Sequence, residues 1–380
     1  MARRSLIFAY LLLYPLGQLP GIWLQQTWQL NFRLHITDFA IIALAALEIM
    51  YIVRRKTQMP SWLKSGVLFV SMGTISLFIS PLFVSSNFNF TALLYAIRIF
   101  AYLSFAYTIS RGIIRTSRLV DLLVVSTSII AFLGVIQYIL MPNLTSLKYL
   151  GWDDHFYRLV GTFLDPAFIG IILVLGIILS LWKRYLYVSG FMTLVLAFTY
   201  SRASWVALLL GLLVLASKKI YQKHTVVIAI LLLLLIPFLP NPGGEGVNLK
   251  RVNSVEQKLV NYKESLSIIK VSPVFGVGLN NICDIKATMR LNSTHNSCSG
   301  LDNSFLFIVA TTGVIGGILF LDFANKIYIT TDTKHKILFC SSLMAILFHS
   351  FFTLTLFYPW VMGWLAILIG ISRTKENKRQ

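Results

Sequence analysis

Long apolar stretches alternate with short polar connections along the whole chain. Most of these stretches run for about 17 to 22 residues, the length that a helix needs to cross the hydrocarbon core of a bilayer. The pattern therefore predicts an all-α, polytopic integral membrane protein with about 12 transmembrane helices. The predicted spans are residues 5–24, 37–53, 64–84, 91–110, 119–140, 164–182, 186–200, 203–217, 224–240, 304–322, 336–352 and 355–372.

The composition agrees with this pattern and excludes an ordinary soluble protein. Hydrophobic residues make up 57% of the 380 residues, charged residues make up 12%, and the mean hydropathy is +0.75. A soluble domain carries about 25% charged residues. We therefore expect residues 1–380 to form a single transmembrane domain. Its first apolar stretch lacks a small-x-small cleavage site, so we interpret it as a retained helix.

The basic residues predict an orientation in the membrane rather than a nucleic-acid partner. The formal net charge is +19. Most of the 33 Lys and Arg residues lie in alternate connections, which is the positive-inside pattern of cytoplasmic loops. Both termini are therefore predicted to be cytoplasmic, and the number of spans to be even. These basic connections hold Arg3 and Arg4; Arg54, Arg55, Lys56 and Lys64; Arg111, Arg115 and Arg118; Lys183 and Arg184; Lys218, Lys219 and Lys223; Lys326, Lys334 and Lys336; and Arg373, Lys375, Lys378 and Arg379.

Two connections on the opposite side are long. Residues 141–163 form a medium loop and residues 241–303 a large one, both of which are periplasmic in a bacterium with this orientation. In the large loop apolar residues recur at intervals of three and four, which predicts an amphipathic helix near 252–270 that ends at Ser272-Pro273. Such a helix lies along the membrane surface or caps a cavity. The apolar stripe consists of Val252, Val255, Leu259, Tyr262, Leu266 and Ile269.

The cysteines and glycines point to no metal or nucleotide site. Cys283 and Cys298 share the large loop, where the oxidising periplasm permits a disulfide and two free thiols are the alternative. Cys340 lies inside a predicted span, where it packs as a small hydrophobic residue. The stretch SPVFGVGLNN contains a Gly-x-Gly without the strand and lysine of a phosphate-binding loop. We therefore predict no metal and no nucleotide cofactor.

Basic groups on the predicted external face are candidates for binding an anion. Arg98 lies about two turns inside its span, where a charge is costly unless it faces a cavity or extends outward to the interface. Arg158 precedes a span, Arg202 occupies the tight turn YSRAS, and Lys258 lies on the loop helix. The planar fork of arginine binds two phosphate oxygens at once. Unless these groups are merely solvated at the rim, they predict a phosphate-bearing ligand embedded in the membrane.

Possible proton acceptors lie on the same side of the membrane. Asp302 is the best placed, at the start of a span in LDNSFLF. It either takes a proton from a hydroxyl group or, like Asn303, caps the helix that follows. Acidic residues near cytoplasmic span ends are instead expected to be solvated, and these are Glu48, Asp121 and Asp322. The remaining external candidates are Asp153, Asp154, His155, His295 and His349.

Four blocks together resemble the O-antigen ligase and polymerase superfamily, over about residues 90 to 325. In order they read RLVGTFLDPAFIG, FTYSRASWVALLLGLL, SPVFGVGLNN and DNSFLFIVATTGVIGGILFL. The resemblance implies a GT-C-like architecture and metal-independent glycosyl transfer at the periplasmic face of the bacterial inner membrane. It implies that Arg158 and Arg202 hold a diphosphate. The implied partners are an undecaprenyl-diphosphate-linked oligosaccharide, bilayer lipids and a chain-length regulator.

The chain departs from the ligase pattern at two places. Ligases read His-Asn at the start of the span after the large loop, where this chain has Asp302-Asn303, although His295-Asn296 occurs seven residues earlier. The family arginine ahead of the Pro-x-x-Gly-x-Gly block is replaced by Lys258 or shifted to Arg251. Aspartate before the asparagine favours an O-antigen polymerase, with O-antigen ligase as the alternative.

These observations define three predicted groups of site residues. The catalytic residues are Asp302, His295 and Arg202. The diphosphate-binding residues are Arg98, Arg158, Arg202 and Lys258. The glycan- or acceptor-binding residues are Asp154, Asn303 and His349. A lipid-linked oligosaccharide flippase is the rival from another class, but the long external loop breaks the paired halves typical of transporters. A structural scaffold explains neither the loop nor the external arginines.

Overall fold

The computed structural model describes residues 1–29, 33–82, 90–150, 153–291 and 300–373. In these residues the regular structure is helical, apart from one isolated bridge between Asn143 and Phe156, which confirms the predicted all-α class. The first helices are α1 (Ala2–Leu13), α2 (Leu19–Thr27), α3 (Ile36–Arg55), α4 (Ser61–Ile79), α5 (Phe90–Ser110), α6 (Thr116–Leu140), α7 (Pro166–Trp182) and α8 (Leu186–Ala197). They are followed by α9 (Arg202–Ala216), α10 (Lys219–Leu235), α11 (Asn253–Val271), α12 (Ile282–Thr288), α13 (Ser304–Ile329), α14 (Thr333–His349) and α15 (Pro359–Ile371).

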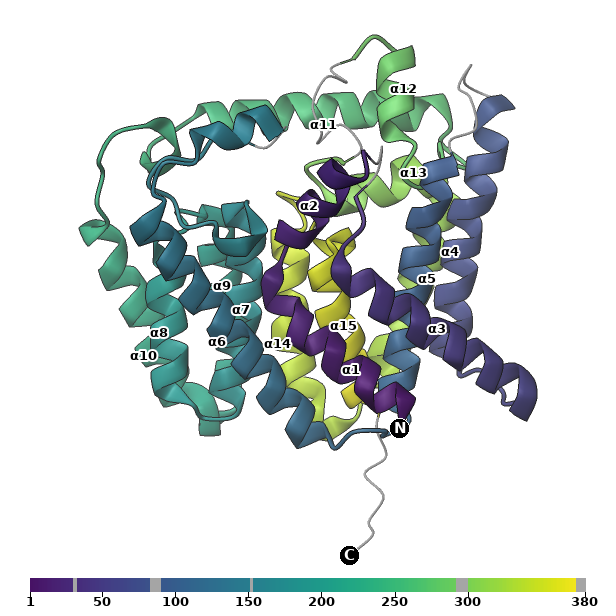
Figure 1. Cartoon of the computed structure of the whole chain (residues 1–380), viewed down its shortest axis with the longest axis horizontal. Helices are drawn as coiled ribbons and strands as arrows, with labels where there is room; N and C mark the ends of the chain where they lie inside the picture. The colour runs from purple at the N-terminus through teal and green to yellow at the C-terminus, as the bar shows by residue number, and fades with distance from the viewer. Residues whose placement is uncertain (30–32, 83–89, 151–152, 292–299, 374–380) are drawn as a thin grey trace, which may run out of the picture.

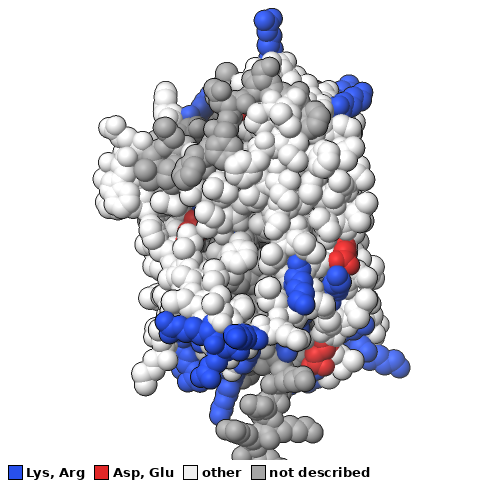
Figure 2. Space-filling model, turned by 90° about the vertical axis from the view of Figure 1, so that its right-hand side faces the viewer, with Lys and Arg blue, Asp and Glu red and all other residues white. Residues whose placement is uncertain are grey.

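The helices fall into two groups that share a central pair. Figure 1 shows α6 and α8–α10 on one side, α3–α5 on the other, and α14 and α15 between them. α7 packs against α6, α8, α9 and α14, and is apolar and buried nearly all round, as expected of a helix enclosed by others. α11 crosses one end of the molecule, and the N-terminus lies at the opposite end. On the face drawn in Figure 2, Lys and Arg gather toward that second end and a broad belt with few charged atoms lies above them.

The predicted number of spans is not confirmed. Six helices of the described residues are long and apolar enough to cross a membrane, and the bent pair formed by α1 and α2 counts as a seventh. Four further apolar helices, α7, α8, α9 and α15, have 17 residues or fewer. They fall short of the about 20 residues that span the hydrocarbon core. The chain is therefore a multi-pass membrane protein whose shorter helices complete the bundle.

The first predicted span, residues 5–24, is broken rather than straight. The helix bends by 88° between Leu16 and Leu19. Gly17 adopts a φ of +57°, and a Cβ at this position would lie 2.4 Å from the carbonyl oxygen of Thr162. The backbone N–H of Gln18 donates to the same carbonyl at 2.8 Å. The hydrogen bond from Gln18 to the loop before α7 thus takes the place of a helical hydrogen bond, and the chain bends at this point.

The SPVFGVGLNN block forms a loop that packs into a kink of α13. At Gly313, with φ +66°, the backbone of α13 leaves the helical conformation. The N–H of Val314 donates to the carbonyl oxygen of Pro273 at 2.9 Å, and the N–H of Gly278 donates to that of Thr311 at 2.9 Å. Loop and helix therefore satisfy one another's backbone groups, which apolar surroundings require. The glycines of this block serve close backbone packing between loop and helix, consistent with rejecting it as a nucleotide motif.

Replacing Gly313 by alanine is expected to destabilise the protein. A Cβ here would lie 2.0 Å from the carbonyl oxygen of Val274, and the positive φ adds backbone strain. We expect a loss of at least about 2 kcal/mol in the free energy of unfolding, measured by thermal unfolding in detergent. Gly317→Ala is the matched control, because a Cβ there would meet only Val309 Cγ2, at 3.8 Å. Equal melting of both variants would contradict the assigned role of Gly313.

Glu48 corrects one sequence expectation. Its side chain is 1% exposed rather than solvated, and it forms ion pairs with Arg3 Nε at 3.0 Å and Arg111 Nη1 at 2.5 Å. The two arginines come from α1 and the end of α5, so the ion pairs join three segments that are distant in the sequence. A carboxylate can be buried here because two cations compensate its charge. By contrast, Asp121 and Asp322 are 44% and 40% exposed, as expected.

Candidate active site

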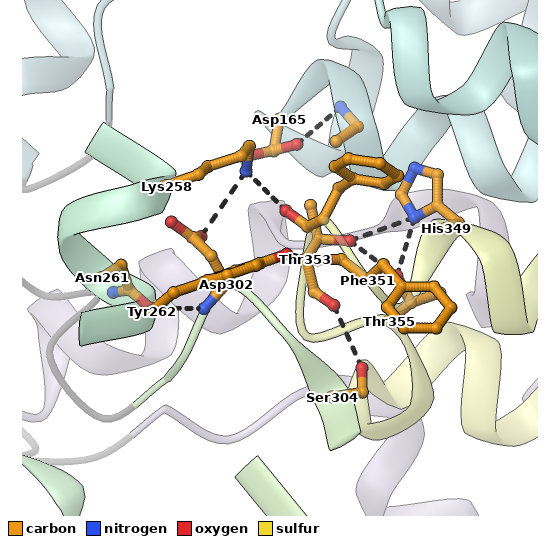
Figure 3. Close-up of polar contacts among 12 residues, drawn as sticks. Asp165, Lys258, Asn261, Tyr262, Asp302, Ser304, His349, Phe351, Thr353 and Thr355 are labelled. Carbon is orange, nitrogen blue, oxygen red and sulfur yellow. Dashed lines mark hydrogen bonds and ion pairs between the residues drawn. The ribbon is translucent and has the colours of Figure 1, made fainter. Parts of the chain in front are cut away.

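The candidate site lies where α11 crosses the ends of α9, α13 and α14. Lys258 Nζ on α11 donates to the carbonyl oxygen of Phe352 at 2.5 Å and lies 3.8 Å from Asp302 Oδ1 (Figure 3). One turn further along, the Tyr262 hydroxyl donates to the carbonyl oxygen of Phe351. The helix predicted near 252–270 is thus present as α11 and is fastened to the segment after α14. It brings Lys258 and Asp302 together although they are 44 positions apart.

Most of the apolar stripe of α11 is exposed, although its Tyr262 forms the contact to Phe351 described above. Val252, Val255, Leu259 and Leu266 are each about half exposed, whereas Ser265 and Ile268 are buried. The face that packs on the protein is therefore the one that carries Lys258 and the buried serine. An amphipathic helix of a membrane protein can leave its apolar side uncovered by protein where lipid is the neighbouring phase.

Asn303, and not Asp302, is the N-cap of α13. Asn303 Oδ1 accepts from the backbone N–H groups of Phe305 and Leu306 at 2.8 and 3.0 Å. The backbone N–H of Asp302 donates to Asn261 Oδ1 of α11 at 2.9 Å. The capping role that the sequence left open between these two residues therefore belongs to the asparagine. The Asp302 carboxylate is left to face Lys258.

The surroundings of Asp302 suit a proton acceptor. Burial raises the pKa of its carboxyl, and the charges of Asp153 and Asp165 act in the same direction. The nearby ammonium groups of Lys258 and Lys286 oppose this by lowering the pKa. A base with a raised pKa holds an accepted proton more firmly, provided that it is still ionised at the working pH.

Three arginines meet beside the N-terminus of α9. Arg158 Nε donates to the carbonyl oxygen of Thr199 at 3.2 Å, and Arg202 Nη2 donates to Ser254 Oγ at 3.0 Å. Arg251 Nη2 donates to the carbonyl oxygen of Tyr200 at 3.0 Å. Their partners are neutral carbonyl and hydroxyl oxygens on this short turn, at the start of α11 and in the segment 246–249 before it. We call these three residues the arginine cluster.

The arginine cluster carries positive charge that the described residues do not neutralise by direct contact. In this part of the chain none of the three guanidinium groups lies within 4.0 Å of a carboxylate oxygen. Burial, and next to it the charge of Arg251, lowers the pKa of Arg158 to about 10. Burial and then Arg202 lower the pKa of Arg251. Arginines whose charges repel one another in this way are suited to bind an anion.

His349 is enclosed in a hydrogen-bonded group and has no exposed surface. Its Nε2 lies 3.1 Å from Ser204 Oγ of α9. Its Nδ1 lies 2.7 Å from Thr355 Oγ1 and 3.0 Å from Thr353 Oγ1. A side chain that is fully buried in this way does not contact a glycan, so the predicted acceptor-binding role does not fit this geometry.

The other predicted residues lie apart from this site or outside the described residues. Arg98 forms a two-pronged ion pair with Asp38 of α3, at 3.1 and 2.6 Å, and its Nη2 also donates to the carbonyl oxygen of Arg33. Its charge is therefore already compensated within the protein. Asp154 is exposed in the 141–163 loop. His295 and Cys298 lie outside the described residues. Within the described ranges no three His, Cys, Asp or Glu side chains gather as metal ligands would.

Sequence reasoning missed Asp165. This residue caps α7, where its Oδ1 accepts from the N–H groups of Ala167 and Phe168 at 2.7 and 3.0 Å. Figure 3 draws it in the same region as Lys258 and Asp302. Its charge acts on both Arg158 and Asp302, so it is near both the arginine cluster and the carboxylate. The Asp-Pro pair at the start of a span was the available signal, because it is a typical helix start.

Fold and site together define a multi-pass helical membrane protein with a cluster of arginines and a carboxylate at one end of its bundle. Residues 187–321 match the model of the O-antigen ligase family. This match confirms the resemblance to the O-antigen polymerase and ligase superfamily over those residues. The matched segment contains Arg202, Lys258 and Asp302, whereas Arg158, Asp165 and His349 lie outside it. No curated protein matches the chain.

Proposed function

We propose that this protein is an O-antigen polymerase, which transfers a glycan from undecaprenyl diphosphate to a sugar hydroxyl of another lipid-linked repeat unit. The observation that carries the proposal is the arginine cluster, with no carboxylate partner among the described residues, beside the Lys258–Asp302 pair. A diphosphate supplies the negative charge that this cluster lacks. The family match supports glycosyl transfer in general.

The reaction requires one bond to form and one to break. The acceptor hydroxyl oxygen attacks the anomeric carbon of the donor, and the bond from that carbon to the diphosphate oxygen breaks. The hydroxyl proton passes to the Asp302 carboxylate, and the electron pair leaves on undecaprenyl diphosphate. The arginine cluster stabilises the negative charge that grows on the leaving group, the most valuable electrostatic contribution to such a transition state. Attack from the side opposite the leaving group inverts the anomeric configuration.

The orientation belongs to the same proposal. The end of the molecule that carries α11 faces the periplasm, and the basic end with both termini faces the cytoplasm of a bacterial inner membrane. The exposed apolar stripe of α11 then lies against outer-leaflet lipid, from which a lipid-linked substrate approaches laterally. We regard Arg98 as a structural residue that joins α3 to α5, and we leave the diphosphate to Arg158, Arg202 and Arg251.

O-antigen ligase is the second candidate, because the matched family model carries that description. A ligase places the glycan on lipid A–core instead of on a second carrier lipid. The Asp302-Asn303 pair, where ligases read His-Asn, favours the polymerase. In the ligase case His295 is the candidate base.

The two activities differ in their products. We expect the purified protein, in liposomes that contain only lipid-linked repeat units, to extend them into longer lipid-linked chains. A deletion strain should then show a single repeat unit on core in a lipopolysaccharide gel, with the ladder restored by complementation. Core alone, with polymer accumulating on the carrier lipid, would identify a ligase instead. Movement of lipid-linked units across the liposome membrane without extension would identify a flippase.

A further inference from the structure

His349 lies between the two parts of the candidate site. On one side it contacts Ser204 in the first turn of α9, the helix that begins with Arg202. On the other side it contacts Thr353 and Thr355 in the segment that follows α14. No other described side chain forms hydrogen bonds to both segments, so these contacts are a direct link between them.

The α9 side of this link controls where Arg202 lies. Ser201 caps α9, and its Oγ lies 2.7 Å from Ser204 Oγ, the atom that contacts His349. Gly170 of α7 confines Ser204 further, since a Cβ at Gly170 would lie 2.3 Å from Ser204 Oγ. The turn that presents Arg202 is therefore held by a chain of hydroxyl contacts that ends on the imidazole ring.

The opposite side of the link controls where Lys258 lies. Two side chains of α11 donate hydrogen bonds to the segment 350–355 (Figure 3). Lys258 Nζ donates to the carbonyl oxygen of Phe352, and the Tyr262 hydroxyl donates to the carbonyl oxygen of Phe351. The carbonyl oxygen of Thr353 accepts from Ser304 Oγ at 3.0 Å, which ties the same segment to the start of α13 next to Asp302. The position of this segment thus determines the position of the Lys258–Asp302 pair.

One proton arrangement satisfies every group in this link. The Thr355 hydroxyl donates to Nδ1 at 2.7 Å and the Thr353 hydroxyl donates to Thr355 Oγ1 at 2.6 Å, so Nδ1 accepts and Nε2 carries the proton. The Nε2–H group then donates to Ser204 Oγ, whose own hydroxyl proton is directed to Ser201 Oγ. A buried network in which every polar group has a partner is rigid and strongly favours one geometry.

We infer that His349 is a positioning residue that sets the distance between Arg202, which holds the leaving diphosphate, and the Lys258–Asp302 pair, which receives the acceptor. The inference rests on the proposed function, because that function gives the distance its role in catalysis. The hydrogen bonds that His349 forms to both segments do not depend on it. Because His349 is fully buried, it acts through Ser204 and the 350–355 segment and touches no substrate. Displacing catalytic groups by about 1 Å can cost about 100-fold in rate.

His349→Phe tests the inference, because it keeps an aromatic ring of similar size and removes both hydrogen-bonding atoms. We expect kcat to fall about 10- to 100-fold, with KM for the lipid-linked donor changed by less than about threefold. The matched control is His335→Phe, the same substitution at the other end of α14, where His335 is buried against Trp182. We expect this control to keep wild-type kinetics and a similar melting temperature.

Hydrogen exchange gives a readout that does not depend on activity. In His349→Phe the backbone amides of residues 199–205 and 350–355 should exchange faster than in the wild type, and in His335→Phe they should not. If His349→Phe does not fold, Ser204→Ala and Thr355→Val each remove one hydroxyl group that contacts His349 and are expected to show the same exchange pattern. Combining Ser204→Ala with His349→Phe should cost no more than His349→Phe alone, because both break the same link.

The outcomes separate the inference from the proposed function. Unchanged exchange in both segments, or a wild-type kcat in His349→Phe, would overturn the positioning role even if the protein is a polymerase. Faster exchange in both segments, in a protein whose wild type extends no lipid-linked units, would keep the link and reject the polymerase function.

Discussion

Arg202→Ala is expected to abolish long-chain polymer while the amount of protein in the membrane stays normal. Arg202 begins α9, carries no ion pair to a carboxylate among the described residues, and lies with Arg158 and Arg251 in the arginine cluster. Loss of one preorganised donor to a developing negative charge costs about 100- to 1,000-fold in rate. We would measure kcat and KM for chain extension in liposomes, together with the ladder on a lipopolysaccharide gel.

Three further variants decide what Arg202 contributes. Arg202→Lys keeps the charge but loses the planar fork, so it should recover only part of the activity. Ser254→Ala removes the hydroxyl partner of Arg202 but leaves the guanidinium in place, and should therefore have a small effect. Arg290→Ala changes an exposed arginine of the same large loop and serves as the control for net charge. Normal polymer length in Arg202→Ala would remove Arg202 from the mechanism.

Asp302→Asn is expected to lower kcat by about 100- to 10,000-fold, the usual contribution of a positioned general base. The substitution keeps the shape of the side chain and the backbone N–H bond to Asn261, so the fold should be retained. Donor binding depends on the arginine cluster, and KM should change little. The variant should therefore still bind undecaprenyl diphosphate, which a direct binding measurement would check. Full activity in Asp302→Asn would transfer the role of base to another residue, with His295 as the first candidate.

The pH dependence of the wild type provides a second test of Asp302. Only the ionised carboxylate accepts a proton, so kcat/KM should fall as the pH decreases through its pKa, which burial raises. Lys258 lowers this pKa, and Lys258→Met removes that positive charge. The acidic limb of the profile should therefore move to higher pH in Lys258→Met. A limb that does not move, or moves to lower pH, would contradict the assignment of Asp302.

The sequence by itself determined the features that depend on neighbouring residues. Apolar stretches of membrane length predicted the all-α, multi-pass class, and intervals of three and four located the loop helix now seen as α11. A cap signal at Asp302-Asn303 marked the start of α13. Such signals can be read because hydrophobic periodicity and capping act over about one turn of chain.

Only the tertiary structure decided which distant charges meet. Arg98 and Glu48 are both single charges within predicted spans, but α3 supplies Asp38 to Arg98, whereas α1 and the residue after α5 supply arginines to Glu48. Packing likewise buried His349 completely, although it lies at the end of its helix. Whether a charge is available to a ligand depends on partners tens of residues away. The positions of these partners depend on how the helices pack, and no local sequence pattern predicts that packing.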